Sequence, residues 1–287
     1  MKKRKLGIVV DSTIGGNFGK NIFPDLSIVH LTIILDNQIC YEKDLDNKTF
    51  LKLSQEGKKF TTSQPNPQLF LKAFQEQFNL GYEHVACITL AQQLSGTFNS
   101  AQKAKQLLDN PKITIIDSGS VGPGMLFTLK KIQNQIQKNI AIDNYPEFFK
   151  KLKEEQEMGK ILFTLNNLKQ LITSKRISKI KSFIGQLFKI KPIIKLQKGI
   201  ISVEKHFRSW NNGFKYLINQ ILQEQKEKGT IEIQIVYVDD EYFAQEFKKE
   251  IEQLKNPNIK CYIYGTISPI IAIHLSSRGF GLYINKI

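Results

Sequence analysis

The distribution of apolar and polar residues divides the first half of the chain into alternating strand-like and helix-like segments. Short apolar runs that stop at turn-forming residues predict buried strands, and the runs lie at 5–10, 28–35, 85–90 and 112–116. Apolar residues at helical spacing predict helices at 48–55, 67–79, 96–108 and 121–138. Strands separated by helices of this length favour a parallel sheet with crossover helices.

The second half of the chain has a different pattern. Strands are predicted at 160–164, 192–196, 199–204, 231–238, 259–264 and 279–284. Helices are predicted at 210–228 and 240–254. The polar helical segment 141–159 has no strand of its own and separates the two patterns. The sequence therefore predicts an α/β protein with two domains, 1–150 and 151–287, of which the second is smaller and has a mixed or antiparallel sheet.

Two clusters of small hydroxyl residues lie where helices are expected to begin. Thr61-Thr62-Ser63 precedes Pro65 and Pro67, and proline suits an early helix turn because it needs no N–H there. Ser95 or Thr97 can cap the helix that follows the apolar run 85–90. Two helix N-termini with hydroxyl groups would form a seat for one small anion. No obvious nucleophile–base pair accompanies these clusters.

The three strand-to-helix turns of the first half fall at the same edge of the predicted sheet. Their sequences are Asp11-Ser12-Thr13, Ser95-Gly96-Thr97 and Asp117-Ser118-Gly119. Ligands of open parallel sheets bind beyond the carboxyl ends of the strands. Asp11 and Asp117 suit turn and cap positions better than acid–base catalysis.

A formal net charge of +15 over 287 residues raises the question of an acidic partner. The lysines are spread over nearly every helical segment and are mixed with glutamates, as on solvated helix faces. A basic surface without a specific partner explains this pattern best. Transient contact with an anionic membrane surface or an acidic partner is the alternative. Nucleic-acid binding is not expected because the charge is scattered.

The sequence does not predict a metal site, a disulfide or a nucleotide cofactor. Cys40, Cys87 and Cys261 are odd in number and far apart, and the four histidines show no ligand spacing. The glycines of 119–124 are wrongly spaced for a dinucleotide loop. The apolar run after the basic start, 6–10, is too short for a signal peptide, and no run is long enough to span a membrane. We therefore expect a cytoplasmic protein without cofactor or metal.

The order and spacing of several motifs resemble the DegV family over about residues 6–284. The motifs that carry the resemblance are Val10-Asp11-Ser12-Thr13, Thr62-Ser63-Gln64-Pro65, Leu94-Ser95-Gly96-Thr97-Phe98-Asn99-Ser100-Ala101, Ile116-Asp117-Ser118, Lys175-Arg176-Ile177, Lys191-Pro192-Ile193-Ile194, Arg208 and His274. Each motif is weak alone, and the ordered set is specific.

The resemblance implies a long-chain fatty acid, such as palmitate or oleate, lying between the two domains. It places the carboxylate at Thr62 and Ser95, with His274 assisting, and it places Arg208 and Arg176 at the rim or at a partner contact. It implies no catalysis by this chain, which would act in lipid transport or fatty acid metabolism. Some family members present the acid to a separate kinase that uses ATP.

The chain departs from the family pattern at three places. Ser174-Lys175 replaces a frequent Gly-Gly before the arginine, and the Gly-Pro-Gly turn that often follows the histidine is missing after His274. The stretch 119–125 is also less rich in glycine and alanine than is usual in the family. These departures put the loop geometry near the carboxylate and the pocket shape in question.

Each proposed site residue also has a plain structural interpretation. Thr62 and Ser95 could serve as helix caps, His274 as a buried core histidine that strengthens anion binding if it is partly protonated, and Arg176 and Arg208 as surface residues. A phosphate-handling α/β enzyme that uses Asp11 and Asp117 is the alternative function, although the phosphate-loop signature is missing.

Overall fold

The structure is a computed structural model that describes residues 4–15, 18–138, 144–165, 169–177, 191–275 and 279–287. Its helices are α1 (Phe18–Ile22), α2 (Asn47–Gln55), α3 (Pro67–Asn79), α4 (Thr97–Leu108), α5 (Pro123–Gln137), α6 (Tyr145–Met158), α7 (Lys169–Thr173), α8 (Trp210–Lys228), α9 (Tyr242–Gln253) and α10 (Pro269–Leu275), with short 3-10 turns η1 (Ser12–Ile14) and η2 (Glu42–Asp44). Its strands are β1 (Leu6–Asp11), β2 (Ser27–Val29), β3 (Thr32–Leu35), β4 (Gln38–Cys40), β5 (Phe60–Ser63), β6 (His84–Thr89), β7 (Ile113–Asp117), β8 (Lys160–Thr164), β9 (Lys191–Gln197), β10 (Ile200–Phe207), β11 (Ile231–Tyr237), β12 (Ile259–Thr266) and β13 (Phe280–Lys286).

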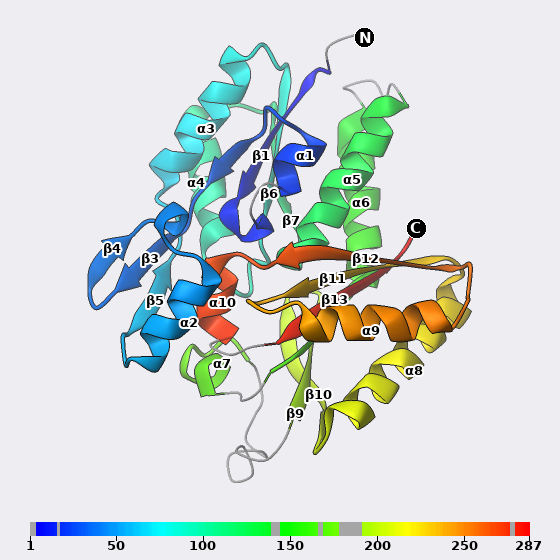
Figure 1. The fold of residues 1–287 in the computed structure, drawn as a ribbon. Coiled ribbons are helices and arrows are strands. Elements are labelled where there is room, and N and C mark those ends of the chain that lie inside the picture. The colour runs from blue at the N-terminus through cyan, green and yellow to red at the C-terminus, as the bar shows by residue number, and fades with distance from the viewer. Residues whose placement is uncertain (1–3, 16–17, 139–143, 166–168, 178–190, 276–278) are drawn as a thin grey trace.

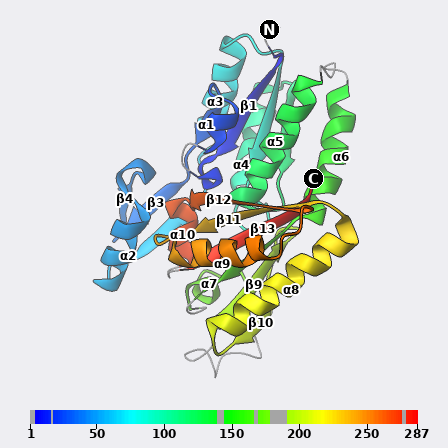
Figure 2. The same cartoon turned by 45° about the vertical axis from the view of Figure 1, so that its right-hand side comes forward.

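The N-terminal half is built on a four-stranded parallel sheet in the order β2-β1-β6-β7. Alternate residues of β1 point to opposite faces, as the strand geometry requires. Val9 packs with α3 and α4, whereas Ile8 and Val10 pack with α5 and α6. The result is a three-layer arrangement with helices on both faces of the sheet (Figures 1 and 2).

A second, three-stranded antiparallel sheet in the order β4-β3-β5 extends from the side of this layer (Figure 1). The β-rich run 28–35 is therefore split, because β2 joins the parallel sheet and β3 joins the small one. The prediction of a helix start at Thr61-Thr62-Ser63 is wrong. These residues form β5, where Thr62 pairs with Ile33, and α3 begins only at Pro67 behind the capping side chain of Asn66.

The C-terminal half forms a six-stranded mixed sheet in the order β10-β9-β8-β13-β11-β12. Only β11 and β12 are parallel, and the other pairs are antiparallel. Helices α8 and α9 cover one face of this sheet, and its other face packs toward α5 of the N-terminal half (Figure 2). The predicted α/β class, with a parallel N-terminal sheet and a mixed C-terminal sheet, is confirmed.

The packing of α6 indicates on which side of the domain boundary this helix belongs. Tyr145, Phe149 and Leu152 of α6 belong to the same buried cluster as Leu6 and Ile8 of the N-terminal sheet. The division at residue 150 stays a prediction, and it cuts this helix. We propose that the boundary lies at the end of α6 instead.

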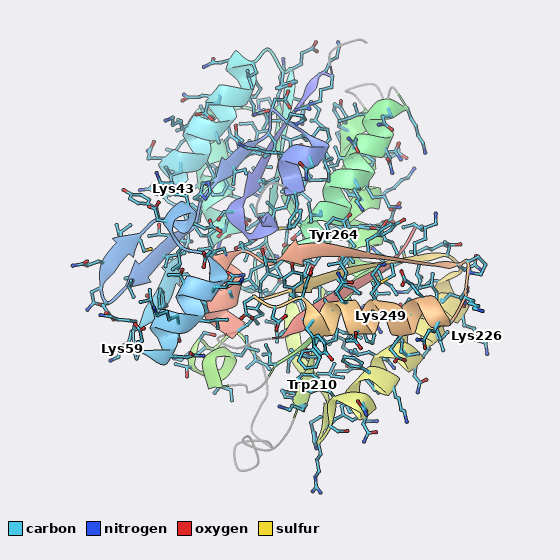
Figure 3. All side chains as sticks on the ribbon, viewed as in Figure 1. Lys43, Lys59, Trp210, Lys226, Lys249 and Tyr264 are labelled. Atoms are coloured by element: carbon cyan, nitrogen blue, oxygen red, sulfur yellow. The ribbon has the colours of Figure 1, made fainter. Side chains whose placement is uncertain are left out.

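Lysines are distributed widely over the molecular surface. Lys43, Lys59, Lys226 and Lys249 are exposed and lie on different parts of the chain (Figure 3). Many charged side chains are paired, as in the contact of 2.8 Å between Lys249 Nζ and Glu246 Oε1. In the described part of the chain, no helix combines the length and apolar character needed to cross a membrane. The same part holds no group of three or more metal-binding side chains.

Candidate functional site

An apolar cavity lies between the two halves of the molecule. Its walls come from the carboxyl ends of the N-terminal strands, from the start of α5, from α10 and from the inner face of the C-terminal sheet. The space open to the centres of water-sized molecules is about 110 Å³. The lining residues with hydrogen-bonding side chains other than tyrosine are Thr13, Thr62, Gln64, Ser95, Thr164, Arg176 and His274.

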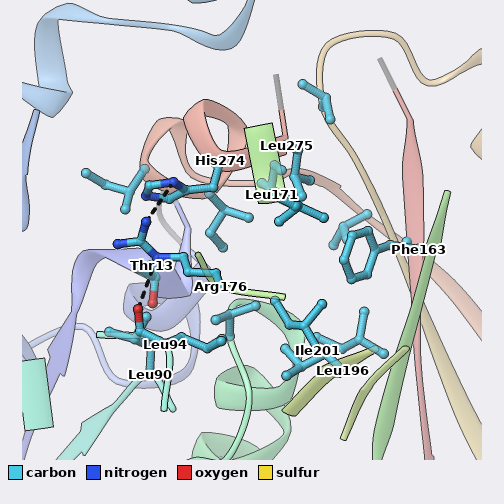
Figure 4. A pocket seen from close by; sticks show the side chains of 18 of the residues that line it. Thr13, Leu90, Leu94, Phe163, Leu171, Arg176, Leu196, Ile201, His274 and Leu275 are labelled. Atoms are coloured by element: carbon cyan, nitrogen blue, oxygen red, sulfur yellow. Dashed lines mark hydrogen bonds between the residues drawn. The ribbon is translucent and has the colours of Figure 1, made fainter. Parts of the chain in front are cut away.

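Arg176, His274 and Thr62 form a row of hydrogen bonds at one end of this cavity. Arg176 Nη1 lies 3.2 Å from His274 Nδ1, and His274 Nε2 lies 2.8 Å from Thr62 Oγ1. Arg176 also donates from Nε to the Leu94 carbonyl at 3.1 Å, which fixes the guanidinium against the N-terminal half (Figure 4). The three side chains are far apart in the sequence and meet only in the folded protein.

This row has a defined direction. A guanidinium can only donate, so His274 Nδ1 must accept and the ring proton of a neutral His274 lies on Nε2. His274 Nε2 then donates to Thr62 Oγ1. The structure gives the Thr62 hydroxyl no second partner among the residues that it describes, so its own proton is available to a ligand in the cavity.

His274 does not meet the condition for strengthening anion binding by its own charge, because it is not protonated near pH 7. Burial lowers the pKa of His274 to about 3, and the nearby positive charge of Arg176 lowers it further in the same direction. The imidazole is therefore neutral near pH 7, and Arg176 supplies the positive charge at this end of the cavity. Burial also lowers the pKa of Arg176, but an arginine stays charged in proteins.

Ser95 lies beside this row, immediately before α4. Its Oγ accepts the backbone N–H of Thr97 at 3.3 Å and lies 2.9 Å from Thr97 Oγ1. The N-cap position itself is held by Gly96, so Ser95 supports the first turn without being the cap residue. The positive end of the helix dipole favours an anion at this place.

The two hydroxyl motifs are joined directly by Gln64. Its Nε2 donates to Ser100 Oγ of α4 at 3.0 Å, and its side chain lies against Gly96. A Cβ atom at position 96 would lie 1.8 Å from Gln64 Oε1. Gly96 thus leaves the space that the Gln64 side chain occupies, whereas its backbone angles, φ −72° and ψ 7°, suit other residues too.

Asp11 organises one wall of the cavity without lining it. Its carboxylate accepts the backbone N–H of Thr13 at 3.0 Å and that of Leu90 at 2.6 Å, and both of these residues line the cavity. Burial raises the pKa of Asp11 to about 6. Asp117 accepts the N–H groups of Gln92 and Gly119. Both aspartates thus hold turns, as the sequence predicts.

Of the five predicted site residues, the structure brings four together. Thr62, Ser95, Arg176 and His274 line the cavity, whereas Arg208 is exposed between β10 and α8 and is not among the lining residues. The sequence places Thr13 at the ligand-binding edge of the sheet and Gln64 in a family motif, but it assigns neither of them to the carboxylate. Gln64 lies within a quoted motif, but no local pattern signals that its amide reaches α4.

The family departure before Arg176 has a visible consequence. Lys175 adopts φ 56°, in the left-handed region that glycine occupies most easily. The turn that ends α7 is thus formed without glycine, and the Lys175 N–H donates to the Ile172 carbonyl at 3.0 Å. The missing glycine turn after His274 falls at 276–278, outside the described residues.

This arrangement suits a single anionic head group with an apolar tail. Hydroxyl protons of Thr62 and Ser95 and the guanidinium of Arg176 offer donors to an acceptor with several lone pairs, such as a carboxylate. The described lining residues include no carboxylate, lysine or cysteine side chain. Most of the other lining residues are aliphatic or aromatic.

Comparison with known proteins places this fold among characterised structures. A fatty-acid-binding DegV family protein of Thermus thermophilus superposes with a TM-score of 0.88 at 20% identity, over 99% of this chain and all (100%) of that chain. A stearic acid-binding protein of Eubacterium ventriosum has a TM-score of 0.85 at 21% identity, over 99% and 98% of the two chains. A DegV family protein of Eubacterium eligens loaded with heptadecanoic acid has a TM-score of 0.80 at 20% identity, over 98% and 100%.

Sequence relatives cover the same span. A DegV domain-containing protein of Staphylococcus aureus is 27% identical over 282 residues, which is 97% of this chain and 98% of the relative. One of Listeria monocytogenes is 25% identical over 279 residues, 96% and 97% of the two chains. The family model described as an uncharacterised protein of the DegV family matches residues 5–286. Because this match spans nearly the whole chain, the protein belongs to the DegV family.

Proposed function

We propose that this protein binds one long-chain fatty acid, such as palmitate or oleate, between its two halves. Thr62 and Ser95 hold the carboxylate with their hydroxyl protons, His274 orients Thr62, and Arg176 supplies the positive charge. The observation that carries the proposal is the one-way row of hydrogen bonds from Arg176 to Thr62, which aims a free donor into an apolar cavity. Fatty acids bound by solved family members support the same ligand class.

The tail would lie along the apolar wall of the cavity. Each buried methylene contributes about 0.8 kcal/mol, so an acyl chain supplies most of the affinity and the head group supplies orientation. The bound carboxylate has no carboxylate, lysine or cysteine neighbour in the described lining to act as a nucleophile or acid. We therefore propose a binding role, in which a separate ATP-dependent kinase would act on the acid. Arg208 is a candidate contact for such a partner or for an anionic membrane surface.

The direct test is to denature the purified protein and analyse the organic extract by mass spectrometry. We expect long-chain fatty acids in the extract and uptake of added palmitate or oleate by delipidated protein. An extract without fatty acid, together with no uptake, would refute the proposal.

Substitution of the hydroxyl residues tests the carboxylate site. Thr62→Val and Ser95→Ala should each weaken fatty acid binding by about 2 kcal/mol, the contribution of a hydrogen bond to a charged group, without unfolding the protein. Thr61→Val is the matched control, because Thr61 is the exposed neighbour on β5 and does not line the cavity. Equal affinities for Thr62→Val and Thr61→Val would remove Thr62 from the site.

A further inference from the structure

Gly281 interrupts the row of side chains that the C-terminal sheet presents to the cavity. In the register of the sheet it pairs with Phe163 of β8 on one side and with Val236 of β11 on the other. All three residues line the cavity. Leu282, the next residue of β13, packs in the cluster formed with α8 and α9, so position 281 points to the opposite face of the sheet, toward the cavity. Phe280, at the start of β13, packs in the same cluster and also lines the cavity.

Neither the backbone nor the local packing requires a glycine at this position. Gly281 is not among the residues with positive φ. A Cβ atom built there would lie 3.2 Å from Phe163 Cβ, 3.6 Å from Val236 Cγ2 and 3.8 Å from Ile161 Cγ2. Only the first contact is tight, and a shift of a few tenths of an ångström would relieve it. Glycine within a buried strand forgoes packing, and here the space it leaves opens into the cavity.

The space left by the missing side chain of Gly281, which we call the notch, lies away from the end of the cavity where Arg176, His274 and Thr62 form their hydrogen bonds. Phe163, its partner in the register, stands across the cavity from Arg176 and His274 (Figure 4). The next residue of β13 on the same face, Tyr283, is buried against Phe127 and does not line the cavity. Along this face of β13, the lining of the cavity therefore ends at Gly281.

We propose that Gly281 sets the longest acyl chain that the cavity accepts, by leaving room for the terminal carbons between Phe163 and Val236. This inference rests on the fatty acid binding proposed above. It assigns the tail end of the ligand to one position of the sheet.

Affinity measurements with a series of saturated acids from lauric to stearic acid test this role. Since a buried methylene is worth about fourfold in affinity, Gly281→Val should weaken binding by about fourfold for each carbon beyond the new limit. Binding of the shortest acids should be unchanged. Phe163→Ala enlarges the same end and should shift the preference toward longer acids.

Two further variants separate the possible outcomes. Ile284→Val alters β13 on its helix-covered face, where Ile284 packs with the α8 and α9 cluster, and should leave the length profile unchanged. Gly281→Ala should shift the chain-length profile in the same direction as Gly281→Val. It replaces Gly281→Val in the test if circular dichroism shows that the valine variant does not fold. A length profile of Gly281→Val or Gly281→Ala that matches the unmodified protein would overturn the role of Gly281. Failure of the unmodified protein to bind any acid would instead refute the proposed function.

Discussion

At the scale of single residues, the central feature is a neutral histidine held between an arginine and a threonine. A histidine in a carboxylate site invites the interpretation of a second positive charge. Burial and the adjacent guanidinium keep the imidazole neutral, so we expect His274 to act by fixing the direction of a hydrogen bond. The positive charge that would attract an anion is on Arg176, the hydrogen-bond partner of His274.

The same histidine makes the stability of the protein depend on pH. With a pKa of about 3 in the folded protein against 6.5 for an ordinary imidazole, the folded state binds fewer protons than the unfolded state between these values. Its contribution to stability is complete above pH 6.5 and is lost as the pH falls toward 3. Compared with His274→Gln, the unmodified protein should lose about 1 to 2 kcal/mol more between pH 6.5 and pH 5.

Urea unfolding followed by circular dichroism at several pH values measures this difference. The comparison between the two proteins matters, because Asp11 and other groups titrate in both. Parallel curves of unfolding free energy against pH would show that His274 is protonated as easily in the folded protein as in the unfolded chain.

At the scale of elements, the site depends on how closely β5 and its loop approach the start of α4. Gly96→Ala places a methyl group where Gln64 lies and should break the hydrogen bond from Gln64 to Ser100. We expect a loss of stability of about 1 to 3 kcal/mol from this overpacking and weaker fatty acid binding. Adding Gln64→Ala should restore much of the stability, since the clash disappears. Thermal unfolding of the single and double variants checks this, and a double variant no more stable than Gly96→Ala would contradict it.

The elements also show what the sequence could predict. Most strands and long helices follow from apolar spacing, and α3, α8 and β8 have the predicted bounds. Thr61-Thr62-Ser63 was misinterpreted because hydroxyl residues before prolines are typical of helix starts, whereas β-branched threonines also pair well in a strand. Helix α10 has no polar face to reveal its period. Ile270, Ala272 and Ile273 pack in the core, and Ile271 lines the cavity.

The sequence predicts which residues form the site better than it predicts their contacts. Motif order pointed to Thr62, Ser95, Arg176 and His274, which do line one cavity. Their contacts could not be predicted, because the Arg176–His274 and His274–Thr62 pairs join segments that are remote in the sequence. Motif order alone groups Arg208 with Arg176, whereas only Arg176 lines the cavity.

At the scale of the whole molecule, the two halves share a hydrophobic core. Ile270 and Ile273 of α10 and Val238 after β11 are buried in one cluster with Leu6 and Ile8 of the N-terminal sheet. Asn47 of α2 adds hydrogen bonds to the carbonyls of Val238, at 2.6 Å, and Ile267, at 2.9 Å. The two halves are thus held together by buried contacts as well as by the covalent chain.

We therefore expect the protein to unfold in one cooperative transition despite its two large sheets. A fatty acid that binds only the folded state should raise the melting temperature in a concentration-dependent manner. Differential scanning calorimetry with and without palmitate measures both effects, and Thr62→Val should keep the single transition while showing a smaller shift with ligand. Two separate transitions in the unmodified protein would contradict the shared core.

The uniform direction of the hydrogen bonds from Arg176 to Thr62 has a consequence for lipid selection. The row offers the cavity the hydroxyl proton of Thr62 and the guanidinium of Arg176, so it favours a head group that accepts hydrogen bonds. A fatty amine, which is protonated near pH 7 and then only donates hydrogen bonds, would be repelled by the guanidinium, and an ester carbonyl would gain hydrogen bonds without charge attraction. We therefore expect the proposed site to bind free fatty acids more tightly than esters or amines with tails of the same length.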